Sequence, residues 1–199
     1  LKVTRGRKLR TDGTVVETNI HYPTDSSLLR DGVRVLSRTL KRAQQVLGDT
    51  ATLAKDAFRD RTRSANRAAR QIGQQARRGQ ETIQTTYRRL LGIARATMGQ
   101  AERVREALMA QADEAADGLR ESLDTFLPRV AQVIEQTTRR IVEGEQVPAG
   151  EKLVSLFEPH TQIIKRGKPQ HDTEFGHKVW LDEVEGGIIS DFRILDGNP

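Results

Sequence analysis

Apolar side chains recur every three or four residues through the middle of the chain. Between positions 29 and 47 they follow one another at spacings of 4, 3, 4, 3 and 4 residues: Leu29, Val33, Leu36, Leu40, Ala43 and Leu47. This is the heptad spacing of a helix with one apolar face. Stripes of the same period continue to about Ile141, and no proline occurs between Pro23 and Pro128. The pattern predicts helices from about residue 25 to residue 144.

This helical region is too long for a single rod. About 118 helical residues at 1.5 Å each would extend over roughly 177 Å, so we expect three or four helices folded into an antiparallel bundle. Glycine is the residue that most readily ends a helix, and we place the bends at Gly48, in the stretch 73–79 and at Gly118. The first helix follows Pro23, and Asp25 or Ser26 is its expected N-cap.

Strand patterns occur on both sides of the helical region. The Thr- and Val-rich segment 9–20 predicts a strand that ends before Pro23. Segments 153–157 and 162–165 are also strand-like, and the apolar segments 175–184 and 188–195 flank a Glu-Gly-Gly turn, which predicts a β-hairpin. We therefore expect an α+β fold in three zones: an opening strand in 1–25, a helical insertion in 26–145, and further strands with the hairpin in 146–199.

Composition excludes several functional classes. The chain has no cysteine, which excludes disulfides, thiolate metal sites and cysteine nucleophiles. Its apolar runs are far shorter than the roughly 20 residues that span a bilayer, and no signal-peptide core follows the start. We therefore expect a soluble intracellular protein without a membrane partner. The four histidines show no paired spacing typical of zinc ligands. Because the chain opens on Leu1 and closes on a turn-like Asp-Gly-Asn-Pro, we expect a piece of a longer protein.

Charge is distributed unevenly along the chain. The net charge is +6, but residues 26–100 carry +11 and residues 101–145 carry −4. One explanation is that the basic segment pairs with the acidic segment 101–124 or is simply solvated; the other is that it binds a polyanion such as DNA. The sequence leaves both open. The candidate DNA-binding residues are the arginines of the basic segment: Arg59, Arg63, Arg67, Arg70, Arg77 and Arg78.

One carboxylate breaks the local strand pattern. Asp12 and Gly13 are both unfavourable inside a strand, and such violations occur at sheet edges or at functional positions, with the edge the commoner case. A strand aspartate can hold a divalent cation if other carboxylates converge on it. Three further candidates lie in the closing segment, but the sequence does not bring them to Asp12: Asp182, Asp191 and Asp196.

Three blocks of the sequence resemble a known family. The segment 10–29, RTDGTVVETNIHYPTDSSLL, is similar to the start of the catalytic domain of bacterial insertion-sequence transposases of the ISNCY type. The segments 157–161 (FEPHT) and 175–182 (FGHKVWLD) resemble downstream blocks of the same family. The resemblance covers both ends of the chain well and the helical middle only loosely, and the YPTDSSLL run is its most specific part.

The resemblance implies a ribonuclease H-like DDE domain that cuts and transfers DNA strands of an insertion sequence. It implies that Asp12 is the first catalytic and metal-binding aspartate, that the hairpin supplies the second and third strands, and that the helical zone is inserted between strands one and two, so that the chain holds only the first strands of the sheet. The remaining catalytic Asp and Glu would lie outside this chain.

The same resemblance implies the cofactors and partners. In the complete enzyme, three carboxylates would hold two Mg²⁺ or Mn²⁺ ions, the partners would be transposon-end and target DNA, and the full-length protein would form a homo-oligomer in the bacterial cytoplasm. The 199 residues alone would be inactive. The alternative is a helical coiled-coil structural or interaction protein without catalysis, which would explain the heptad stripe but not Asp12-Gly13 or the hairpin.

Overall fold

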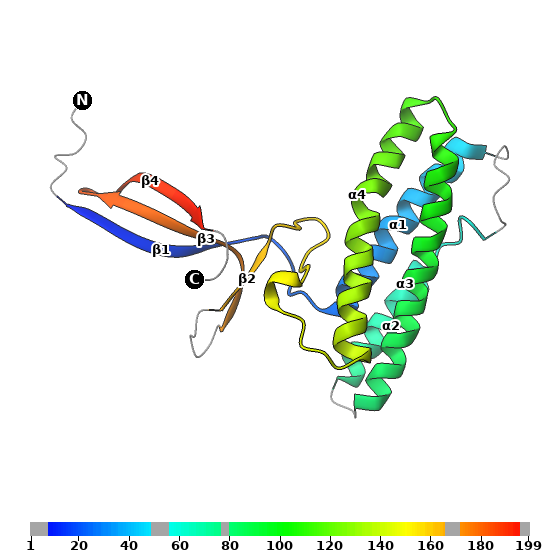
Figure 1. The fold of residues 1–199 in the computed structure, drawn as a ribbon, viewed down its shortest axis with the longest axis horizontal. Coiled ribbons are helices and arrows are strands. Elements are labelled where there is room, and N and C mark those ends of the chain that lie inside the picture. The colour runs from blue at the N-terminus through cyan, green and yellow to red at the C-terminus, as the bar shows by residue number, and fades with distance from the viewer. Residues whose placement is uncertain (1–7, 49–55, 77–79, 166–171, 196–199) are drawn as a thin grey trace. The chain divides into compact units, whose positions relative to one another are not determined.

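The chain has an α+β fold, as the sequence predicts. The computed structural model describes residues 8–48, 56–76, 80–165 and 172–195, which form four α-helices and an open four-stranded antiparallel sheet (Figure 1). Two compact units can be distinguished: a helical unit, residues 23–159, and a sheet unit, residues 1–22 together with 160–199. The chain therefore leaves the sheet unit after its first strand and returns to it after the last helix.

The helical unit consists of α1 (Asp25–Leu47), α2 (Thr62–Gln75), α3 (Gln80–Met109) and α4 (Glu114–Thr137). A π-helical turn, η2 (Thr138–Val142), extends α4, and a short 3₁₀ turn, η3 (Ala149–Glu151), follows. α1 contacts α2, α3 and α4, and α3 also contacts α2 and α4. The six residues of the predicted heptad stripe on α1 are all buried, at most 1% exposed, so this prediction is confirmed.

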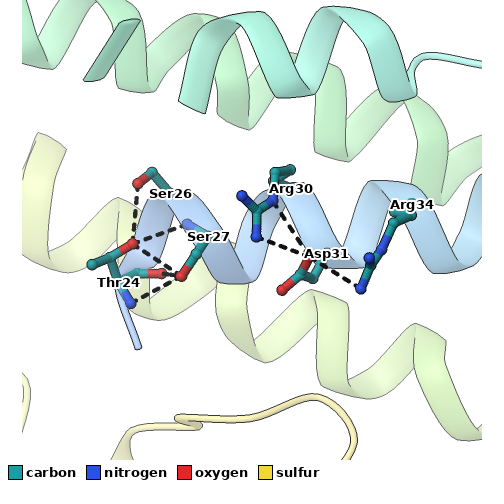
Figure 2. Close-up of polar contacts among 6 residues, drawn as sticks. All are labelled: Thr24, Ser26, Ser27, Arg30, Asp31 and Arg34. Atoms are coloured by element: carbon teal, nitrogen blue, oxygen red, sulfur yellow. Dashed lines mark hydrogen bonds and ion pairs between the residues drawn. The ribbon is translucent and has the colours of Figure 1, made fainter. Parts of the chain in front are cut away.

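The N-cap of α1 is Thr24 and not Asp25 or Ser26, so that prediction is wrong by one or two residues. Thr24 has an extended backbone, and its Oγ1 accepts the N–H of Ser27 at 3.1 Å while Ser27 Oγ accepts the N–H of Thr24 at 3.0 Å (Figure 2). This reciprocal pair is a capping box. It leaves Asp25 as the first helical residue, where a carboxylate interacts favourably with the helix dipole.

Two of the three predicted bends match the helix ends. Gly48 caps the C-terminus of α1 with φ 54°, and α2 ends at Gln75, inside the stretch 73–79 of which residues 77–79 lie outside the described residues. The bend predicted at Gly118 is wrong, because Gly118 lies within α4. The chain turns at residues 110–113 instead, where Asp113 Oδ1 accepts the N–H of Ala115 at 3.3 Å and starts α4. One glycine inside a helix costs only about 1 kcal/mol, so α4 continues through Gly118, and Asp113 supplies its N-cap.

The strand predicted at 153–157 is also wrong. This segment is irregular, and its Leu153 and Leu156 are buried in the core of the helical unit. Gln136 of α4 satisfies both backbone groups of Leu153, accepting its N–H at 2.9 Å and donating to its carbonyl at 3.1 Å. Arg129 donates to the carbonyl of Leu156 at 2.7 Å. Since α4 side chains supply these hydrogen bonds, the segment needs no strand partner.

The sheet unit consists of β1 (Leu9–Glu17), β2 (Gln162–Lys165), β3 (Thr173–Val184) and β4 (Ile188–Leu195). β3 is central: β1 pairs with one edge of it, while β2 pairs with its first residues and β4 with the remainder on the other edge, all antiparallel. The predicted β3–β4 hairpin is confirmed, and its turn uses Gly186 and Gly187 at φ 97° and 77°, which only glycine adopts readily. No helix in the described part of the chain is both long and apolar enough to cross a membrane.

We predict opposite effects for two Gly→Ala substitutions in the helical unit. A methyl group on Gly32 of α1 would lie 2.9 Å from Cγ2 of the buried Val130 of α4, whereas one on Gly118 would meet nothing within 4 Å. Gly118→Ala should raise the free energy of unfolding by about 0.5–1 kcal/mol, because alanine is the better helix former. Gly32→Ala should lower it, because overpacking costs about 1–3 kcal/mol and the gain in helix propensity offsets only part of that cost. Urea denaturation followed by far-UV circular dichroism measures both, and equal effects would contradict the close α1–α4 contact.

Candidate functional site

Asp12 is the fourth residue of β1, and its side chain is exposed. The strand register places it opposite Leu181 of β3, which is in turn opposite Phe192 of β4. Cross-strand partners project from the same face of a sheet, so the carboxylate shares its face with two apolar side chains. Within the described residues it makes no hydrogen bond or ion pair, and it is therefore accessible to a ligand from solvent.

The position of β1 accounts for the unfavourable Asp12-Gly13 pair. β1 is an edge strand of the described sheet, and edges are where charged residues and glycine are best tolerated. The edge position of β1 is thus enough to explain why Asp12 and Gly13 are tolerated in a strand. A functional role for Asp12 rests on its exposure and on the sequence resemblance.

The two aspartates on later strands within the described chain lie on the other face. Asp182 of β3 is opposite Asp191 of β4, and Thr11 of β1 donates its hydroxyl to Asp182 Oδ1 at 2.8 Å. Because neighbouring residues of a strand project from opposite faces, Asp12 points away from these three side chains. Asp196 lies outside the described residues. The sheet therefore does not bring Asp182 or Asp191 to Asp12.

A divalent cation needs several oxygen or nitrogen ligands around one point. Among the residues that the structure describes, no group of three or more His, Cys, Asp or Glu side chains could hold a metal ion. His160 and His177 come together as a stacked pair with ring centroids 5.1 Å apart, but within the described residues they belong to no group of three such side chains. The two-ion centre implied by the resemblance therefore does not fit these residues alone, which supply Asp12 and no second carboxylate beside it.

Gly176 determines how closely β1 approaches β3. A methyl group at this buried position would overlap the carbonyl oxygen of Val16 and lie 2.8 Å from Cα of Glu17. Beyond the strand, the N–H of Thr18 still donates to the carbonyl of Phe175 at 3.0 Å, and the ring of Tyr22 meets Phe175 edge-on at 5.5 Å. The sequence pattern marked 175–184 as a strand but gave no sign of this contact. The position of Asp12 depends on it.

The second candidate site is the exposed face of α2. Arg63, Arg67 and Arg70 lie one and two turns apart on this face and are all exposed. The opposite face is buried through Ala65, Ala68 and Ile72. Arg59 is exposed in the turn before α2, whereas Arg77 and Arg78 lie outside the described residues. The small buried face therefore holds α2 on the bundle while the arginines remain in solvent.

An open hollow of about 930 Å³ runs along this face. Every residue that lines it is polar or charged: Asp60, Thr62, Arg63, Asn66, Arg67, Arg70, Gln71, Gln74 and Gln75. Asp60 accepts the N–H of Thr62 at 2.8 Å, and its hydrogen bonds to Thr62 lower the pKa of this carboxyl. A surface with three guanidinium groups, amide side chains and no apolar residue suits a polyanion better than an apolar ligand.

The acidic segment does not neutralise these arginines. Asp124 pairs with Arg105 at 3.3 Å and Asp117 pairs with Arg120 at 3.0 Å. In the described chain, Arg63, Arg67 and Arg70 make no ion pair with residues 101–124. Pairing of the two segments, one of the alternatives that the sequence leaves open, is therefore absent from the described part of α2. A solvated face or a polyanion-binding face remains.

A buried polar cluster at the start of α1 escaped the sequence analysis. Asp25 is 5% exposed and its Oδ2 lies 3.1 Å from Nη1 of Arg140. Burial raises the pKa of Asp25, against the opposing effects of Arg140 and Gln136. Burial also raises the pKa of the neighbouring Tyr87, with the charge of Asp25 as a second cause. The sequence pattern indicated that a helix starts near Asp25. It did not indicate that Arg140 and Gln136 lie beside this carboxylate.

A second buried carboxylate lies two turns further along α1. Asp31 is 3% exposed, and its Oδ1 lies 3.3 Å from Arg30 and 3.4 Å from Arg34 (Figure 2). Both arginines are on the same helix as Asp31. Its role is to neutralise a carboxylate where α1 packs in the bundle.

Comparison of the chain with models of protein families, with curated proteins and with solved structures found no match.

We predict a pH-dependent contribution of Asp25 to stability. Burial raises its pKa above the ordinary value of an aspartate in the folded state. The folded protein therefore keeps this proton over a pH range in which the unfolded chain has lost it. Stability from this group is therefore present below about pH 4 and is lost as the pH rises through the folded pKa. The free energy of unfolding, measured by urea denaturation, should fall more between pH 4 and pH 7 than in Asp25→Asn. A parallel dependence in both proteins would show that burial does not control this carboxyl.

Proposed function

We propose that this chain is part of the catalytic domain of a DDE-type DNA transposase, with Asp12 as its first metal-binding carboxylate. The observation that carries the proposal is the pairing of β1, with Asp12 exposed at its centre, to the β3–β4 hairpin. The resemblance assigns the first catalytic aspartate to the first strand of a ribonuclease H-like sheet and the next two strands to this hairpin. Direct antiparallel pairing of β1 with β3 supports that assignment.

The position of the helical unit in the chain supports the same proposal. The chain passes from β1 into residues 23–159, which have their own core, and then into β2, β3 and β4. An insertion between the first and second strands of a catalytic sheet would have this order. β2 departs from the pattern, because this short strand also pairs with β3 and the resemblance does not require it.

We further propose that the arginine face of α2 contacts DNA in this transposase. Its three described arginines are exposed along a polar hollow and have no acidic partner in the described chain. Guanidinium groups bind phosphates through charge and paired hydrogen bonds. Transposon-end or target DNA would be the polyanion, and a homo-oligomer of the full-length enzyme would bring two such faces to the two ends.

A helical interaction protein without catalysis is the competing function. One observation favours it: the heptad stripe of α1 is fully buried in a helical core, which such a protein needs and the proposed catalysis does not use. The two functions can be distinguished at Asp12: the transposase needs its negative charge to bind a metal ion, and the interaction protein does not.

We predict that Asp12→Asn in a full-length transposase containing this chain lowers DNA strand cleavage by roughly a hundredfold or more, because one metal ligand loses its charge. The side chain is exposed and unpaired in the described chain, so the thermal unfolding midpoint should not change. Cleavage of labelled transposon-end DNA in Mg²⁺ measures the effect.

The matched control is Asp182→Asn, which changes an aspartate on the opposite face of the same sheet and keeps an oxygen to accept the Thr11 hydroxyl. It should cleave normally. Full activity of Asp12→Asn, or equal loss in both variants, would reject Asp12 as a catalytic ligand and favour the interaction protein.

We predict that replacing Arg63, Arg67 and Arg70 together by Gln weakens DNA binding and reduces its salt dependence. If all three contact phosphates, the slope of log K against log salt should become shallower by about 2.7, since each contact contributes about 0.9. Fluorescence anisotropy with a labelled duplex at several salt concentrations gives the slope.

The control removes the same charge elsewhere, through Arg42, Arg88 and Arg103, which are exposed on α1 and α3. Its slope should change little. An equal change in both triple variants would show that overall charge, rather than the face of α2, determines binding.

A further inference from the structure

The outer edge of β4 is open in the described sheet. β4 pairs with β3 on one side, and no described strand pairs with its other side. Two large apolar side chains on this strand are exposed, Phe192 at 64% and Ile194 at 61%. An unpaired edge with exposed apolar side chains is a template for another strand. The chemistry of β4 indicates which strand fits it.

Two hydrogen bonds show which backbone groups of β4 point outward. Ser190 Oγ donates to the carbonyl of Asp182 at 3.1 Å, so this carbonyl points toward β4. Asp191, opposite Asp182, then directs its own groups toward β3, and Phe192, the next residue, directs its N–H and C=O outward. In the single chain, the N–H of Phe192 donates to Asp191 Oδ1 at 2.9 Å. A strand that pairs at Phe192 would therefore replace this side-chain acceptor with its own carbonyl oxygen.

The two charged residues beside Phe192 have opposite signs, so they can pair with the same two residues of a second copy. Asp191 and Arg193 flank Phe192 on the opposite face of the strand, both exposed, with Arg193 Nε 3.8 Å from Asp191 Oδ2. A two-fold axis through Phe192 would place a second, antiparallel β4 so that each Asp191 lies opposite the Arg193 of the other copy. Opposite charges in this position stabilise a strand pair, and like charges destabilise it.

Neighbouring registers lack this match. A two-fold axis through residue 191 would place Asp191 opposite Asp191, and an axis through residue 193 would place Arg193 opposite Arg193. The register centred on Phe192 is also the one in which the outward backbone groups of Phe192 in the two copies meet directly. Charge therefore selects the register centred on Phe192, and backbone hydrogen bonding permits it. The irregularity in β4 pairing lies on its other side, toward β3.

We propose that β4 binds a second copy of this chain, edge to edge and antiparallel, with the two-fold axis at Phe192, so that two sheets become one. The two Phe192 rings then adjoin on one face, and four alternating charges form on the other. The interface is isologous and closes as a dimer. It does not depend on the transposase proposal, since it uses neither Asp12 nor the arginines of α2.

Charge reversal tests the register. Asp191→Arg and Arg193→Asp each place like charges opposite one another, and each should raise the dissociation constant of the homodimer about tenfold or more. Mixing the two variants restores opposite charges at both positions, so the mixture should form a heterodimer as tight as the wild type. Sedimentation velocity distinguishes the 22.3 kDa chain from twice that mass. Wild-type protein that stays monomeric at 100 µM, or a mixture that stays monomeric, overturns the proposal.

Cross-linking of an introduced cysteine tests the same strand register without changing any charge. The chain has no cysteine, so Phe192→Cys introduces a single thiol that meets its own copy at a Cα separation of about 5.5 Å, within disulfide range. Ile194→Cys is the matched control, because in this register its two copies lie roughly 13 Å apart along the strands. Mild oxidation should cross-link the first variant and not the second.

The open edge of β1 provides a further control for the cross-linking experiment. Arg10 and Asp12 flank Thr11 on β1 with the same spacing, so Thr11→Cys reports pairing through that edge. Cross-linking of Thr11→Cys without cross-linking of Phe192→Cys would show that copies meet through β1 and would overturn the assignment to β4.

Discussion

The antiparallel contact between β1 and β3 is the interaction on which the sheet unit depends. Residues from opposite ends of the chain form it, and more than 150 residues separate Thr11 from Asp182, which it joins by a hydrogen bond. At one end of the ladder the close approach requires Gly176, because a methyl group there would overlap the carbonyl oxygen of Val16. The pairing continues from that end to Leu9 and Val184, and it places Asp12 on a sheet rather than on a free segment.

The helical unit depends on a comparable close approach. Gly32 lets α1 lie against Val130 of α4, and the long apolar side chains of α1 fill the space around that contact. Many positions on α2 and α3 are alanine, which contributes little buried area. The large buried side chains of the core come mainly from α1, α3 and α4, while α2 is attached through two alanines and one isoleucine.

The way α2 packs on the bundle leaves its arginines exposed. Because α2 buries only a narrow small-residue face, its arginines need not pack or pair with neighbours and stay exposed along a polar hollow. Two acidic residues of α4, Asp117 and Asp124, pair with Arg120 and Arg105 instead. The charge of the α2 arginines is thus not cancelled by residues 101–124 of the described chain.

The sequence alone determined the elements whose signal is local. A heptad stripe identifies the buried face of α1, and a Gly-Gly turn between apolar segments identifies the β3–β4 hairpin, because periodicity and turn chemistry act over a few residues. The tertiary structure decided what depends on distant partners. It gave Leu153 hydrogen bonds from Gln136 in place of a strand neighbour, moved a bend from Gly118 to the cap at Asp113, and set Asp182 on the face opposite Asp12. No local pattern records which residue a folded chain will bring alongside.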